Sequence, residues 1–131
     1  MQNFKFIRSA IAVAAVASLA TFAPTAALAD GPQAVSTAAT HAGLAASSAD
    51  LAGAQRHLHH VLNCLVGPGG EGFDATPGNP CAAAGGAIPQ TADAAAKEKL
   101  QKVATQVRTA IAGGNLDASK KAATEAQAAL K

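Results

Sequence analysis

Residues 56–67 read RHLHHVLNCLVG, and the glycine- and proline-rich stretch that follows them reaches Cys81. Three of the four histidines and both cysteines of the chain lie between Arg56 and Cys81. The sequence on either side is rich in alanine, the residue that favours helix most strongly. Both the architecture and the candidate chemistry of the chain depend on this stretch.

Leucines recur every seven residues before this stretch and through it. The leucines with this spacing are Leu44, Leu51, Leu58 and Leu65, and Leu62 falls on the same stripe of a helix. We therefore expect one long helix over about residues 33–66, ended by Gly67 and the proline that follows it. Small and polar residues at 47–50 weaken this helix, and a break there would divide it in two.

The remainder of the chain predicts a loop and a helical hairpin. Residues 67–90 are rich in glycine and proline and lack periodicity, so we expect a loop. Apolar residues at helical spacing predict helices over about residues 91–112 and 116–130, separated by a Gly-Gly-Asn turn. The expected fold is all-α: a small up-and-down bundle of three helices, or four if the first one breaks.

The first 29 residues have the organisation of a secretory signal peptide. Lys5 and Arg8 precede an apolar run at residues 11–20, which is too short to span a bilayer comfortably. The sequence Ala-Leu-Ala at 27–29 is typical of a cleavage site. We therefore expect residues 30–131 to form a single mature domain that is periplasmic or secreted, with no membrane span after cleavage.

The two cysteines are best explained as a disulfide, because exported chains keep such bonds. A bridge between Cys64 and Cys81 would tie the loop to the end of the first helix. A thiolate metal ligand and a redox-active pair are the alternatives, but redox pairs usually have the spacing Cys-x-x-Cys.

Charge excludes one class of partner. The chain has ten basic and eight acidic residues, and two of the basic residues lie in the expected signal peptide. The mature chain is thus balanced in charge, and it lacks a basic patch interleaved with aromatic residues. Nucleic acid is therefore not an expected partner.

Two histidines carry the strongest functional signal. His57 and His60 are one turn apart on the expected helix, on a face away from the leucine stripe that we expect to meet solvent. Two imidazoles at this spacing can bind one Zn²⁺ or Cu²⁺ ion without movement of the backbone. Cys64 shares their face but is lost as a ligand when it is oxidised.

Four more residues are candidate ligands. His59 points away from the pair, and His41 lies far from it along the expected helix. Glu71 and Asp74 are carboxylates that the loop could bring back to the histidines.

These features lead to one hypothesis and two alternatives. The hypothesis is a small exported helical protein that binds a transition metal through its histidines for buffering or delivery. The first alternative is a metal-free structural bundle that acts by contact with a protein partner, and the second is non-covalent haem binding. We do not expect an enzyme, because no known catalytic motif occurs in the sequence.

Overall fold

The computed structural model describes residues 30–131, and the expected signal peptide, residues 1–29, lies outside the described residues. The described part of the chain contains five helices and no strand. They are α1 (Asp30–Ser47), α2 (Leu51–Val66), α3 (Ala87–Gln90), α4 (Ala94–Gly113) and α5 (Leu116–Leu130). The all-helical class is confirmed, but the number of helices is five and not three or four.

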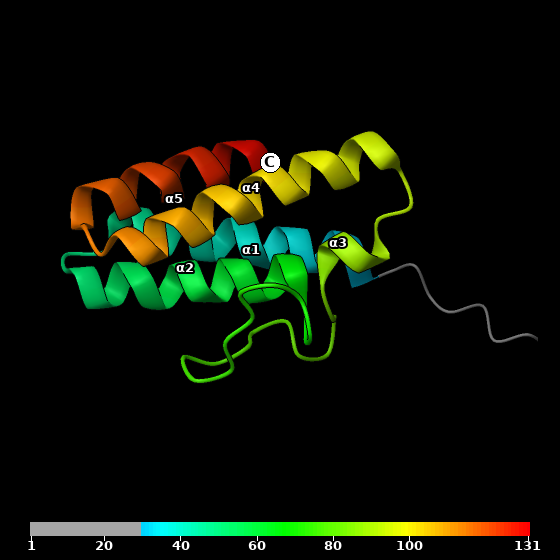
Figure 1. Ribbon diagram of the computed structural model, residues 1–131, viewed down its shortest axis with the longest axis horizontal. Helices are drawn as coiled ribbons and strands as arrows, with labels where there is room; N and C mark the ends of the chain where they lie inside the picture. Colours follow the sequence, from blue (N-terminus) through cyan, green and yellow to red (C-terminus); the bar gives the residue numbers. More distant parts are fainter. Residues whose placement is uncertain (1–29) are drawn as a thin grey trace, which may run out of the picture.

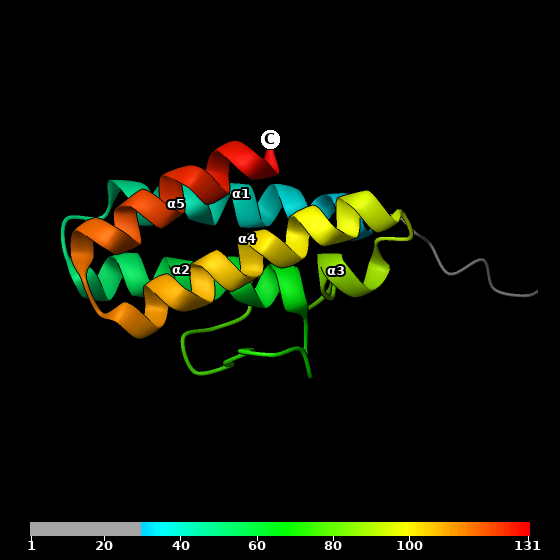
Figure 2. The same cartoon turned by 45° about the horizontal axis from the view of Figure 1, so that its top comes forward.

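The four long helices run alternately in opposite directions, and α3 is a single short turn (Figure 1). Helix α1 packs against α2 and α5, and α4 packs against the same two helices from the other side. Figure 2 shows α4 crossing α2 obliquely, while the loop after α2 lies along the outside of the bundle. Each long helix therefore has an antiparallel neighbour on either side.

The helix expected over residues 33–66 is in fact two helices, so the prediction of one long helix is wrong. The Ser48 hydroxyl donates to the Leu44 carbonyl at 2.9 Å and so provides a hydrogen-bond partner for a backbone carbonyl in the last turn of α1. The Asp50 carboxylate then accepts from the Gly53 backbone N–H at 2.7 Å and caps the start of α2. The chain reverses direction between them, which leaves Leu44 43% exposed instead of continuing the leucine stripe.

The other helix ends follow their local signals more closely. Gly67 ends α2 with a positive φ of 71°, and its N–H donates to the Asn63 carbonyl. Helix α4 begins later than expected because Asp93 caps it. Asn115 caps α5, which has its expected bounds. The expected loop over residues 67–90 contains one unforeseen helical turn, α3.

The core joins an alanine face to a face of large side chains. Four alanines of α1 at helical spacing are fully buried: Ala34, Ala38, Ala42 and Ala45. Helix α2 supplies large apolar residues, namely Leu58, Val61, Leu62 and Leu65. Small side chains let the α1 backbone approach its neighbours closely, so polar residues beside this face can reach across to α2. Among residues 30–131, no helix is both long and apolar enough to cross a membrane.

The expected disulfide between Cys64 and Cys81 is present, with a Cα–Cα distance of 5.1 Å. It fixes the loop to the last turns of α2. A second close approach joins the backbones of Gly67 and Gly86, where a Cβ on Gly86 would lie 2.6 Å from the Gly67 nitrogen. The loop is therefore tied to α2 by the disulfide and packs closely on its end at Gly67.

Candidate metal centre

Three histidines from two helices meet at the interface between α1 and α2. His41 comes from α1, and His57 and His60 come from successive turns of α2. Their ring centroids lie 4.7–5.6 Å apart. On one continuous helix His41 and His57 would be about 24 Å apart, so the reversal between α1 and α2 creates the cluster. We call these three residues the histidine triad.

Ring nitrogens of the triad converge. The Nδ1 atoms of His41 and His57 are 3.1 Å apart, and those of His41 and His60 are 3.3 Å apart. One nitrogen from each residue lies within 4.8 Å of the other two. Two nitrogens bound tetrahedrally to one Zn²⁺ at about 2.0–2.1 Å would lie about 3.3–3.4 Å apart. The triad is therefore close enough to hold a metal ion once the side chains adjust around it.

A loop carbonyl sets the tautomer of His60. Its Nε2 lies 2.7 Å from the carbonyl oxygen of Pro77. A carbonyl only accepts hydrogen bonds, so Nε2 carries the proton, and a neutral His60 has its lone pair on Nδ1. Metal-bound histidines commonly donate their other N–H in this way. The nitrogen that faces His41 is thus the one available for a metal.

Burial and neighbouring charges favour the neutral form of two of the three histidines, His41 and His57. Burial, with the adjacent His60 and His57, lowers the pKa of His41 from 6.5 to about 4. The pKa of His57 is also lowered, first by burial and then by His60 and Arg56. Only neutral imidazole binds a metal, so these rings are in the ligating form without added base.

In the metal-free triad, the Nδ1 atom of His41 is shared between two hydrogen-bond contacts, one to His57 and one to His60. The Nδ1 atom of His41 faces both other rings, yet a ring nitrogen of neutral histidine has either one proton or one lone pair. At least one of the three nitrogens must therefore carry a proton when they form hydrogen bonds with one another. A cation at their centre would accept all three lone pairs.

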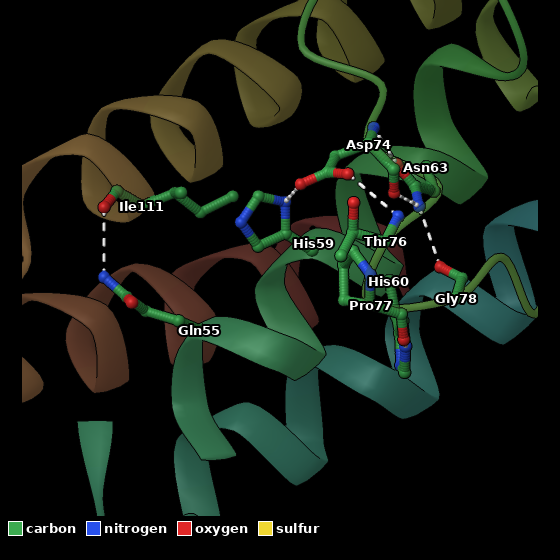
Figure 3. Close-up of polar contacts among 9 residues, drawn as sticks. All are labelled: Gln55, His59, His60, Asn63, Asp74, Thr76, Pro77, Gly78 and Ile111. Carbon is green, nitrogen blue, oxygen red and sulfur yellow. Dashed lines mark hydrogen bonds and ion pairs between the residues drawn. The ribbon is translucent and has the colours of Figure 1, made fainter. Parts of the chain in front are cut away.

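His59 lies outside the triad, and its ring points toward Asp74 of the loop (Figure 3). Its Nδ1 is 4.0 Å from Oδ2 of Asp74 and has no hydrogen-bond partner among the described residues. Asp74 accepts from the Thr76 backbone N–H at 2.8 Å, and this bond is the main cause of its lowered pKa. These two candidate ligands thus contact each other and not the triad.

The remaining candidates are also occupied elsewhere. Glu71 forms an ion pair with Arg108 of α4 at 3.0 Å. Cys64 is buried in the disulfide.

His57 and His60 are half-buried against α1, so the expectation that they face solvent is wrong. Of the six candidate ligands, only His57, His60 and His41 lie together.

Two residues next to the triad were not identified from the sequence. Pro77 acts through its backbone carbonyl, which carries no signal in the sequence. Asn63 is fully buried and binds the same loop. The sequence did contain one signal for Asn63, a polar residue placed among the leucines of an expected helix. A buried amide requires hydrogen-bond partners, so its position indicated a contact with another segment.

Comparisons with known proteins find no matching family model, no similar curated protein and no similar solved structure.

Proposed function

We propose that this protein is a small exported bundle that binds one transition-metal ion, Zn²⁺ or Cu²⁺, through His41, His57 and His60. Its role would be to hold or deliver the ion and not to catalyse a reaction. The observation that carries this proposal is the convergence of three imidazole nitrogens within 4.8 Å of one another.

The donor set favours particular metals. Imidazole suits Zn²⁺, Cu²⁺ and other late transition metals, whereas Mg²⁺ and Ca²⁺ prefer oxygen ligands. Cu²⁺ generally binds such nitrogen sites more tightly than Zn²⁺ does. Three protein ligands leave a fourth position for water or for a group on a receiving partner, as delivery requires.

Haem is less well supported by the same geometry. Axial histidines of a haem approach the iron from opposite faces of the ring. Here the Nδ1 atoms of His41 and His57 are only 3.1 Å apart, which suits two ligands on one side of a single ion.

The Cys64–Cys81 disulfide is compatible with export, because such bonds persist in oxidising compartments. Mass spectrometry of the protein from the exported fraction tests this part of the proposal. A chain that begins at Asp30 is expected, and retention of residues 1–29 would contradict it.

Calorimetric titration of the untagged protein with Zn²⁺ and with Cu²⁺ tests the metal site. We expect one ion per chain. Outer-shell changes at metal sites reduce affinity by about 10–100-fold, so His41→Ala, which removes a ligand, should reduce it at least as much. His59→Ala is the matched control, a histidine on α2 outside the triad, and should bind as the parent does. Equal affinity in His41→Ala and the parent would rule out the triad as the site.

A further inference from the structure

The side chain of Asn63 holds part of the loop in place. Asn63 is fully buried, and its Nδ2 donates to the carbonyls of Asp74 at 2.7 Å and Gly78 at 2.9 Å. Its Oδ1 accepts from the Asp74 backbone N–H at 3.0 Å. Figure 3 shows the amide reaching into the loop between these residues. One side chain thus closes the segment 74–78 into a turn.

That turn contains the carbonyl that contacts the triad. Pro77 lies between the two residues that Asn63 binds, and its oxygen is 2.7 Å from Nε2 of His60. Asn63 and His60 are three residues apart on α2, so both lie on the side of the helix that meets the loop. The bonds to Asn63 therefore determine where the Pro77 carbonyl sits relative to the imidazole.

The position of this carbonyl matters for ligation. Without an acceptor at Nε2, a neutral histidine can move its proton to Nδ1, the nitrogen that faces His41. A proton there would block the lone pair that a metal needs. A fixed acceptor on the outer nitrogen also restrains the orientation of the ring.

We propose that Asn63 is a positioning residue for the triad, which holds the Pro77 carbonyl against His60 Nε2 and so keeps His60 Nδ1 free for a metal ion. The inference rests on the proposed function, because it assigns a supporting role at the same site. Asn63 itself is not a ligand.

Nitrogen-15 NMR of the histidine rings, in metal-free protein near pH 7.5, measures the tautomer directly. In the parent we expect His60 to be protonated on Nε2. In Asn63→Leu, which keeps a branched side chain but has no donor, we expect a mixture of tautomers. Titration with Zn²⁺ should show about 10–100-fold weaker binding in this variant than in the parent.

Gln55→Ala is the matched control. Gln55 is also an amide on α2, and it donates to the Ile111 carbonyl at 3.1 Å, as Figure 3 shows, away from the loop. A purely structural role predicts that both variants lower the melting temperature and leave the tautomer unchanged. A positioning role predicts that only Asn63→Leu alters the His60 tautomer and the affinity for Zn²⁺.

The outcomes separate this inference from the proposed function. A parent that binds Zn²⁺, with Asn63→Leu unchanged in tautomer and affinity, would overturn the role of Asn63 alone. A parent that shows the expected tautomer but binds no Zn²⁺ would overturn the proposed function alone. If Asn63→Leu does not fold, Asn63→Asp takes its place, because it keeps the acceptor oxygen and loses only the two donated hydrogen bonds; an unchanged His60 tautomer and Zn²⁺ affinity in this variant would overturn the inference.

Discussion

Acidification from pH 7 to pH 5 should destabilise the metal-free protein, and His41 should account for much of the loss. Burial and the adjacent rings of His60 and His57 lower the pKa of His41 from its ordinary 6.5 to about 4. The unfolded chain therefore takes up a proton near pH 6.5, whereas the folded chain resists protonation until about pH 4. The stabilisation from neutral His41 is complete above pH 6.5 and is lost as the pH falls toward 4.

The two pKa values of His41 give the size of the effect. A pKa difference of one unit corresponds to about 1.4 kcal/mol. Only the part of this pKa difference between pH 6.5 and pH 5 acts when the pH falls from 7 to 5. Without solvent screening, that part would lower the free energy of unfolding by about 2 kcal/mol. His41 is only half-buried, so solvent screening reduces this figure, and we expect a loss of about 1–2 kcal/mol.

Urea unfolding in the presence of EDTA, followed by circular dichroism at pH 7, 6 and 5, measures this loss. His41→Gln removes the titrating group but keeps a polar side chain, so its free energy of unfolding should fall less on acidification. His59→Gln removes a histidine outside the triad and should behave as the parent does. Equal acid sensitivity in the parent and His41→Gln would refute the reasoning.

Two further predictions concern the disulfide and the alanine face. Replacing Cys64 and Cys81 by alanine removes a bridge between residues that are 17 positions apart in the sequence. The loss of this bridge should lower the free energy of unfolding by about 3 kcal/mol. Thermal unfolding measures this, and an unchanged melting temperature would show that other contacts hold the loop. Ala38→Leu enlarges a fully buried side chain of α1 and should destabilise the protein by about 1–3 kcal/mol. Ala128→Leu, at an exposed position of α5, should change stability by less than about 0.5 kcal/mol; equal melting temperatures of these two variants would contradict close packing at α1.

Local signals located most of the helix ends. Gly67 ends α2 and Asn115 caps α5, because capping depends on residues within one turn of the helix end. The disulfide was also predictable, since the chain has two cysteines and both lie near the loop. The break at residues 47–50 was expected only as the alternative, because the leucine spacing through these residues matched a continuous helix. Capping by Asp50 and the hydroxyl of Ser48 outweighed that spacing.

Part of the candidate metal site was likewise predictable from the sequence, and part of it was not. The sequence alone identified the histidine-rich turn, the pairing of His57 with His60, and imidazole as the ligand type, all of which follow from helical spacing. Only the tertiary structure joined His41 to this pair, directed His59 toward the loop, and placed the Pro77 carbonyl on His60. The physical reason is that spacing along one helix fixes neighbours on that helix, whereas a ligand from a second helix depends on how closely two backbones pack. Here that approach depends on the fully buried alanines of α1, whose role appears only when α2 folds back against them.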